Sequence, residues 1–230
     1  MPTSSLRATG PERLHRLRIG LLGGTFDPVH VGHLALARAA ALALGLDEIR
    51  FIPTGRSWQK APTASSGAHR LAMLQQAIGD TPGWRVDTRE LERPGASYTI
   101  DTLLELRAEL GAEPALVLLM GGDQLRNLPS WHRYRELLDH AHIAATRRGP
   151  HRLSEFDPPL EALIAEHGRE ALPDAPAGSI VFFRMAPVAV SATLLRAALA
   201  RDEQAAELLP APVLDYIRRN HLYQNRGTPA

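Results

Sequence analysis

The chain has 230 residues, 44% of them apolar, and a formal net charge of +1 from 26 Lys and Arg against 25 Asp and Glu. This composition supports a buried core and excludes wholesale disorder, and the charge balance excludes a general polyanion binder. The sequence contains no cysteine, which excludes disulfide scaffolds, zinc fingers and thiol nucleophiles. At roughly 150 residues per domain, one large domain is favoured.

Residues 1–17 are predicted to be a flexible leader, rich in arginine and without the apolar stretch of a secretory signal. An organellar transit peptide is the alternative for this segment. Residues 224–230 are predicted to be a flexible tail. No run approaches the ~20 apolar residues of a membrane span, so we expect no membrane partner and take the cytoplasm as the default location. The balanced charge likewise leads us to expect no nucleic-acid partner.

The apolar run Ile19–Leu22 stops at two glycines and predicts a buried strand. The Ala- and Leu-rich segment His33–Leu44 predicts a helix, and Glu48–Ile52 predicts a second strand. Together they form a βαβ unit, which implies parallel strands with a right-handed crossover.

The alternation of helices and strands continues along the chain. In chain order, we first predict a helix at Ala68–Ile78, a strand at Arg85–Thr88, a helix at Asp101–Leu110 capped by Asp101 and a strand at Ala115–Met120. A helix at Trp131–Leu138 capped by Ser130 and a strand at His142–Thr146 follow. The last elements are a helix at Leu160–Glu166, a strand at Ile180–Phe183 and helices at Ala192–Ala200 and Val213–Asn220. The pattern is that of an α/β, doubly wound, Rossmann-like parallel sheet in a single domain over 18–223, with C-terminal helices and a variable excursion at 149–178.

The segment that follows the first strand has the composition of an anion site. Gly23 and Gly24 allow positive φ and close backbone approach, and the amides up to Phe26 can converge on one anion. His30 and His33 are three residues apart at a helix start, which puts both imidazoles on one face beside the positive end of the helix dipole. A phosphate chain is the natural occupant.

Other interpretations of this segment are weaker. A Gly-Gly pair is often only a turn, and a lone histidine is often a satisfied surface or core residue. A metal site would need a third ligand, and no zinc-type spacing follows, so we predict no metal site in the protein. The G-x-G-x-x-G spacing of a dinucleotide-cofactor loop is also missing.

Gly23 to Leu34 resembles the G-x-F-D-P-x-H-x-G-H signature of the HxGH nucleotidyltransferases, and within them the nicotinate-nucleotide adenylyltransferase family. This resemblance implies transfer of AMP from ATP to nicotinate mononucleotide, giving deamido-NAD and pyrophosphate in NAD biosynthesis. It implies that the catalytic residues are His30 and His33 and that Gly23, Gly24, Thr25 and Phe26 cradle ATP.

A second signature, Ser191 to Arg196, resembles the family's I-S-[ST/A]-T-x-[IL]-R, and implies that Ser191, Thr193 and Arg196 hold the triphosphate. Taken by itself, Ser191 is also an ordinary helix cap. Gly121 to Leu125, with a tryptophan behind it, resembles the family's G-x-D-x-x pattern. It implies ATP contacts from Gly122 and Asp123, the latter to ribose hydroxyls.

The stretch Asp87 to Thr102 resembles the family's D-x-R-E-L-x-R-x-G-x-S-Y-T-x-D-T block. It implies a mononucleotide pocket in which Trp131 stacks on a flat ring while Tyr98 and Thr99 frame the other side. Ordinary core packing is the alternative for both aromatics. Lys60 is expected to hold the mononucleotide phosphate, although Trp58 and Gln59 replace the family's usual Pro and His.

The nucleophile of the implied reaction is a phosphate that is already an anion, so positioning and charge stabilisation suffice. Mg²⁺ is expected with ATP because it neutralises triphosphate charge. Two alternatives stay open: a sister enzyme that uses nicotinamide mononucleotide or pantetheine phosphate, and a non-catalytic nucleotide-binding protein. The oligomeric state is left open.

Overall fold

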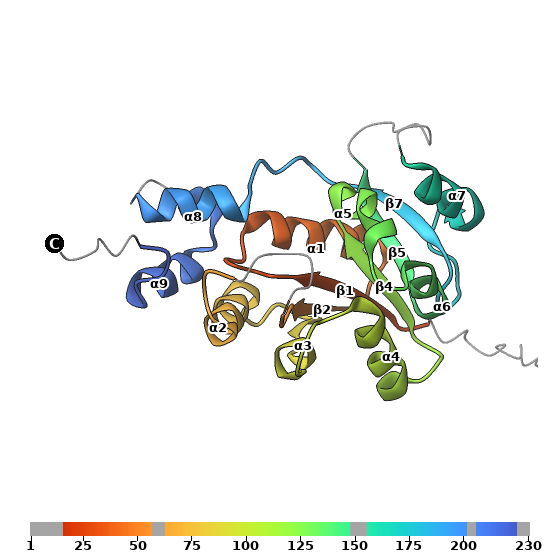
Figure 1. Cartoon of the computed structure of the whole chain (residues 1–230), viewed down its shortest axis with the longest axis horizontal. Helices are drawn as coiled ribbons and strands as arrows, with labels where there is room; N and C mark the ends of the chain where they lie inside the picture. Colours follow the sequence, from red (N-terminus) through yellow and green to blue (C-terminus); the bar gives the residue numbers. More distant parts are fainter. Residues whose placement is uncertain (1–15, 57–62, 148–155, 202–205, 225–230) are drawn as a thin grey trace, which may run out of the picture.

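The computed structural model describes residues 16–56, 63–147, 156–201 and 206–224. Within these residues, seven strands form one sheet in the order β3-β2-β1-β4-β5-β7-β6, and each pair of neighbours is parallel (Figure 1). The strands are β1 (Arg18–Gly24), β2 (Glu48–Pro53), β3 (Trp84–Val86), β4 (Ala115–Met120), β5 (His142–Arg147), β6 (Gly168–Arg169) and β7 (Ile180–Arg184).

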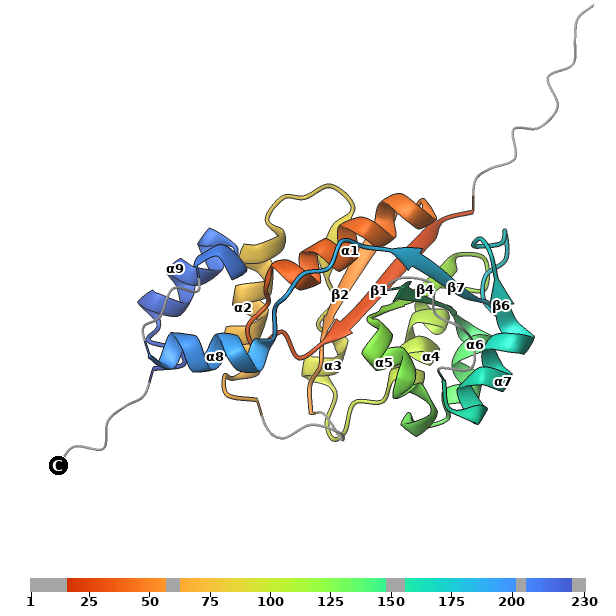
Figure 2. The ribbon, with the colours of Figure 1, turned by 90° about the horizontal axis from the view of Figure 1, so that it is seen from above.

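Helices cover both faces of this sheet. One face carries α1 (Val31–Leu44), α2 (Gly67–Ile78), α8 (Ala192–Ala200) and α9 (Ala211–Arg219). The other carries α4 (Thr99–Leu110), α5 (Gly122–Arg126), α6 (Leu137–His140) and α7 (Pro158–His167). Shorter helical turns are α3 (Arg89–Glu92) and the 3₁₀ turns Leu128–Ser130, Tyr134–Glu136 and Ala206–Leu208. Figure 2 shows α8 and α9 beside α2 at one end of the molecule and α6 and α7 at the other.

The central strands are buried on both sides because helices cover both faces, so apolar residues dominate them instead of alternating with polar ones. All six residues of β4 are buried. Val117 and Leu119 pack into the core under α1, whereas Leu116, Leu118 and Met120 pack into the core under α4. The tight packing above β1 explains Gly20, where a Cβ atom would lie 2.7 Å from Cδ1 of Leu46 on the segment that follows α1.

The predicted doubly wound parallel sheet is confirmed, and each predicted strand is found within two residues of its expected bounds. The predicted C-terminal helices are also confirmed as α8 and α9. Within the variable excursion at 149–178, the predicted helix Leu160–Glu166 is confirmed as α7, and the edge strand β6 was not predicted.

The predicted helix Trp131–Leu138 is wrong. Trp131 is extended (φ −75°, ψ 145°) and Arg133 is left-handed (φ 52°, ψ 40°), so the chain becomes helical only from Tyr134. The two predicted caps are wrong as well. Ser130 donates its hydroxyl back to the carbonyl of Asn127 at 2.7 Å, and α4 begins early enough to place Asp101 inside its first turn.

Because all strands of the sheet are parallel, their carboxyl ends meet at one edge. The chain reverses its direction of travel across the sheet between β1 and β4, and such switch points are where open α/β sheets bind ligands. Among the described residues, no helix has the length and apolar character needed to cross a membrane.

Candidate functional site at the carboxyl ends of β1 and β4

Two cavities lie at this switch point and share one wall. The larger, about 500 Å³, contains both histidines of the loop, and we name it the histidine cavity. The smaller, about 120 Å³, contains Trp131, and we name it the tryptophan cavity. Four residues line both of them: Gly23, Gly24, Thr25 and Gln124. The last residues of β1 therefore separate two compartments that meet at the phosphate loop.

The two histidines of the loop lie together, as their spacing predicted. His30 is the N-cap residue of α1 and His33 is in the first turn of the helix. Their rings stack with centroids 3.7 Å apart and planes inclined by 22°. The first turn of α1 contains no acidic residue, so nothing there offsets the positive end of the helix dipole. Both side chains line the histidine cavity.

The protonation of the pair follows from its hydrogen bonds. The backbone N–H of His30 donates to Nδ1 of His33 at 3.2 Å. This nitrogen is therefore an acceptor, and the neutral ring of His33 carries its proton on Nε2. Burial lowers the pKa of His30 to about 4, against the smaller opposing effect of its backbone hydrogen bond, so its ring is neutral at pH 7. Its Nδ1 is buried with no protein partner.

The paired glycines do not act as predicted. Gly23 and Gly24 remain in β1 as its last residues, and neither has positive φ. The left-handed residue of the loop is Phe26 instead, at φ 48°. Its fully buried ring packs edge-on against His33 with centroids 4.9 Å apart. A Cβ on Gly24 would lie 3.2 Å from that ring, so this glycine leaves room for Phe26.

Gly122 and Asp123 line the far side of the histidine cavity at the start of α5. The N–H of Gly122 donates to Oγ1 of Thr146 at 3.2 Å, which fixes this turn to β5. The carboxylate of Asp123 is almost fully exposed and is 3.7 Å from the guanidinium of Arg126. It is accessible to a hydroxyl-bearing ligand.

Ser191, Thr193 and Arg196 lie just outside this cavity. Val190 lines it, and Ser191 follows directly as the N-cap residue of α8. The guanidinium of Arg196 donates to the backbone carbonyl of Asp27 at 2.7 Å and to Oγ1 of Thr193 at 3.3 Å. In this structure Arg196 therefore holds the backbone of the phosphate loop.

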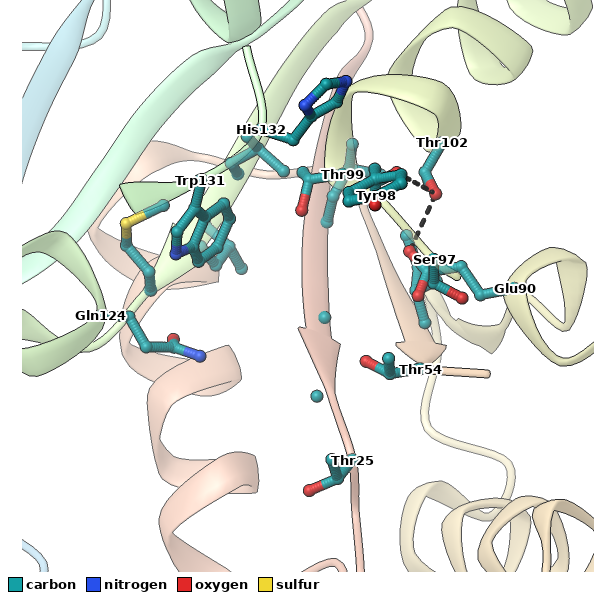
Figure 3. Close-up of a pocket in the computed structure, with 17 residues that line it drawn as sticks. Thr25, Thr54, Glu90, Ser97, Tyr98, Thr99, Thr102, Gln124, Trp131 and His132 are labelled. Atoms are coloured by element: carbon teal, nitrogen blue, oxygen red, sulfur yellow. Dashed lines mark hydrogen bonds between the residues drawn. The ribbon is translucent and has the colours of Figure 1, made fainter. Parts of the chain in front are cut away.

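The tryptophan cavity contains the predicted aromatic and hydroxyl groups. Figure 3 shows Trp131 facing Tyr98 and Thr99 across the opening, with His132 above them. The rings of Tyr98 and His132 lie 4.6 Å apart. Nε1 of Trp131 is buried without a protein partner although it lines a cavity, which indicates a donor that a ligand would satisfy.

Six further polar residues of this cavity were not predicted: Thr54, Glu90, Ser97, Thr102, Gln124 and His132. Oγ of Ser97 is also buried without a partner. Glu90 is buried, its carboxylate accepts from Thr102 Oγ1 at 2.8 Å, and burial raises its pKa. Ser97 and Glu90 both belong to the sequence block that predicted the pocket, but hydrophobic periodicity does not tell which polar residues of a loop turn inward. Lys60, with Trp58 and Gln59, lies outside the described residues.

A bound metal needs a cluster of ligands, and among the described residues no three His, Asp or Glu side chains are grouped to hold an ion. The groups that surround both cavities are neutral or hydrogen-bond donors for the most part. Backbone amides, imidazoles and an indole N–H suit a ligand that carries its own negative charge.

Comparison with known proteins agrees with this geometry. Residues 21–198 match the cytidylyltransferase-like family model. The chain is 48% identical to the probable nicotinate-nucleotide adenylyltransferase of Aeromonas salmonicida over 209 residues, covering 90% of this chain and 97% of that protein. It is 45% identical to the protein of the same description from Pseudomonas aeruginosa strain UCBPP-PA14 over 210 residues, again covering 90% and 97%.

Two solved structures share the fold. Plasmodium falciparum nicotinic acid mononucleotide adenylyltransferase complexed with NaAD superposes with a TM-score of 0.66 at 18% identity, covering 90% of this chain and 98% of that one. A putative nicotinate-nucleotide adenylyltransferase from Vibrio parahaemolyticus gives a TM-score of 0.62 at 12% identity, covering 91% and 96%.

Proposed function

The chain belongs to the nicotinate-nucleotide adenylyltransferase family, and we propose that it transfers the adenylyl group of ATP to nicotinate mononucleotide, forming deamido-NAD and pyrophosphate. One observation carries the proposal for this chain: two cavities meet at a wall made by the end of β1, with a stacked histidine pair on one side and an aromatic pocket on the other. A dinucleotide has this shape, with two nucleosides joined through phosphates.

The volumes favour one assignment of the substrates. ATP is the bulkier ligand and belongs in the histidine cavity, with its ribose near Asp123 and its phosphates at Gly24 to Phe26. The pyridine ring of the mononucleotide belongs in the tryptophan cavity between Trp131 and Tyr98. The phosphate of the mononucleotide and the α-phosphate of ATP then meet at the shared wall.

The reaction forms one P–O bond and breaks another. An oxygen of the mononucleotide phosphate attacks the α-phosphorus of ATP, and the bond from that phosphorus to the oxygen bridging to the β-phosphate breaks. Pyrophosphate leaves with the electron pair. The attacking oxygen is already ionised, so no residue has to remove a proton, and catalysis consists of positioning and of stabilising negative charge.

His33 donates from Nε2 to an oxygen of the transferring phosphate, because its Nδ1 is occupied by the N–H of His30. His30, neutral and stacked beneath it, supplies a second donor whose strength rises as phosphate charge accumulates nearby. Ser191, Thr193 and Arg196 adjoin the cavity where the β- and γ-phosphates lie. Lys60, on the segment beyond β2, is assigned to the mononucleotide phosphate.

Mg²⁺ enters as part of the substrate, bound to the triphosphate. The described residues offer no cluster of ligands that fits a resident ion, so ATP oxygens and water are its ligands. The ion neutralises triphosphate charge when bound.

The test is a pyrophosphate-release assay with MgATP and, in parallel, nicotinate mononucleotide, nicotinamide mononucleotide and pantetheine phosphate. Release with nicotinate mononucleotide at the highest kcat/KM, together with deamido-NAD as product, supports the proposal. Preferred use of another acceptor overturns the substrate assignment. ATP binding without pyrophosphate release from any of the three identifies a nucleotide-binding protein without this activity.

A further inference from the structure

Asp27 lies inside the phosphate loop, between the proposed cradle and His30, and its side chain is buried. Only 2% of the residue is exposed. Its carboxylate accepts three hydrogen bonds, from the N–H of Ala64 at 2.6 Å, from Oγ of Ser65 at 2.5 Å and from the hydroxyl of Tyr223 at 2.6 Å. A buried carboxylate is tolerated only when its oxygens are satisfied in this way.

The backbone on both sides of this carboxylate is fixed as well. Arg70 of α2 donates to the carbonyl of Thr25 at 2.8 Å, and Arg196 of α8 donates to the carbonyl of Asp27 at 2.7 Å. These two carbonyls are therefore both occupied by arginine side chains. The loop between Gly24 and His30 is therefore held by groups from α2, α8 and the chain end, each remote in sequence.

The backbone that brings Tyr223 to the loop adopts an unfavourable conformation. After α9 ends at Arg219, both His221 and Tyr223 have positive φ, at 51° and 63°. Such conformations cost about 1–3 kcal/mol each for residues with a Cβ and persist only where the surrounding contacts hold them. The contact that the turn achieves is the Tyr223 hydroxyl, which lies within hydrogen-bonding distance of both Asp27 and Ser65.

We propose that Tyr223 is a positioning residue for the adenylyl transfer. Its hydroxyl fixes the position of the Asp27 carboxylate by a hydrogen bond. The carboxylate in turn fixes the conformation of the loop that positions the amides of Gly24 to Phe26 and the ring of His30. This inference rests on the proposed function. Tyr223 lines neither the histidine cavity nor the tryptophan cavity, so its effect on the reaction passes through Asp27.

The experiment compares Tyr223→Phe with Tyr216→Phe in the full-length protein. Tyr216 is a matched control because its hydroxyl also joins the C-terminal region to α2. It lies 3.0 Å from Nδ1 of His69, in a partly buried hydrogen bond that does not involve the loop. We measure kcat, both KM values and the melting temperature for each variant and the unmodified protein. Displacing a catalytic group by an ångström can cost up to about 10²-fold in rate.

We expect Tyr223→Phe to lower kcat by about tenfold, with the KM for nicotinate mononucleotide within about twofold, and Tyr216→Phe to leave kcat within about twofold. Ser65→Ala removes the other hydroxyl on Asp27 and should lower kcat in the same direction, which provides the test if Tyr223→Phe does not fold. Equal kcat in the Tyr223, Ser65 and Tyr216 variants overturns the inference. Inactivity of the unmodified protein toward nicotinate mononucleotide overturns the proposed function instead.

Discussion

His30 and His33 are joined twice: their rings stack with centroids 3.7 Å apart, and the N–H of His30 donates to Nδ1 of His33 at 3.2 Å. The hydrogen bond fixes the tautomer of His33 so that Nε2 is its donor. The stacking makes each ring part of the packing of the other. The pair is thus a preorganised donor set, the kind of group that stabilises charge as it develops in a transition state.

Replacing His33 with alanine should therefore lower kcat by about 10²–10³, the range for losing one preorganised donor, while both KM values change much less. Steady-state pyrophosphate release measures both quantities. His167→Ala is the control, because His167 lies on α7 and contacts the carbonyl of Gly178, on the other side of the sheet. An unchanged kcat in the His33 variant would remove this residue from the mechanism.

The burial of His30 predicts a pH dependence of stability. Its pKa falls from the ordinary 6.5 to about 4 in the folded protein, so between these values the unfolded chain binds a proton that the folded chain does not. Stability therefore rises with pH across this window and is lost as pH falls from 6.5 toward 4, by about 3 kcal/mol for a shift of this size.

Denaturant unfolding of the protein and of His30→Gln, at several pH values from 4 to 7, measures this effect. As pH falls, the free energy of unfolding should decrease more for the unmodified protein than for His30→Gln, because glutamine has no proton to gain. The difference between the two free energies should therefore become smaller. His142, whose pKa burial also lowers, is present in both proteins and cancels. Parallel curves for the two proteins would contradict the assignment.

The fold was predictable because its signals are local. The apolar run Ala115–Met120 is a central strand in a sheet covered on both faces, and the Ala- and Leu-rich segment after the loop is a helix by propensity. The helix expected at Trp131 failed because Arg133 takes a left-handed conformation, which residue type and periodicity do not report.

In the site, too, the features that depend on local sequence could be predicted, and those that depend on tertiary structure could not. The stacking of His30 and His33 follows from a spacing of three residues at a helix start. The contact of Asp27 with Tyr223 joins residues 196 positions apart, so only tertiary structure brings it about. In the sequence, Tyr223 stands at the end of the predicted domain, and nothing there indicates that its hydroxyl contacts the phosphate loop.

The buried, unpartnered indole N–H of Trp131 predicts a role beyond stacking. Trp131→Phe keeps an aromatic ring but removes the donor, so the KM for the mononucleotide should rise about 2–10-fold, the value of one hydrogen bond of about 0.5–1.5 kcal/mol. The KM for ATP should not change. Trp84→Phe is the control, because Trp84 packs against Phe51 away from both cavities. A rise in the KM for ATP alone would contradict the assignment of the two cavities.

Lys60 is the only lysine in the sequence, which makes its proposed role directly measurable. Acetylation by an amine-selective reagent modifies one side chain and removes its charge, so activity should fall as the peptide containing Lys60 becomes acetylated. Nicotinate mononucleotide should slow this modification, since its phosphate would cover the amine. Peptide mass mapping separates Lys60 from the terminal amine. Full acetylation of Lys60 with full activity would contradict its role.

Gly32, between the two histidines, has no room for a side chain. A Cβ there would lie 2.7 Å from Cγ1 of Val190 and 3.1 Å from Nδ1 of His30, so Gly32→Ala must displace one of them. We expect a loss of kcat/KM for ATP of about 10²-fold, the cost of a shift of about 1 Å in a reacting geometry. Adding Val190→Ala removes Cγ1 and lets the new methyl group move away from His30.

The double variant Gly32→Ala with Val190→Ala should therefore recover part of the lost kcat/KM, and Val190→Ala alone is its control. A loss of kcat/KM in the double variant that is smaller than the sum of the two single losses, in free-energy terms, indicates that the two residues are in direct contact. Strictly additive losses would show that the methyl group acts on the histidine pair without involving the segment before α8.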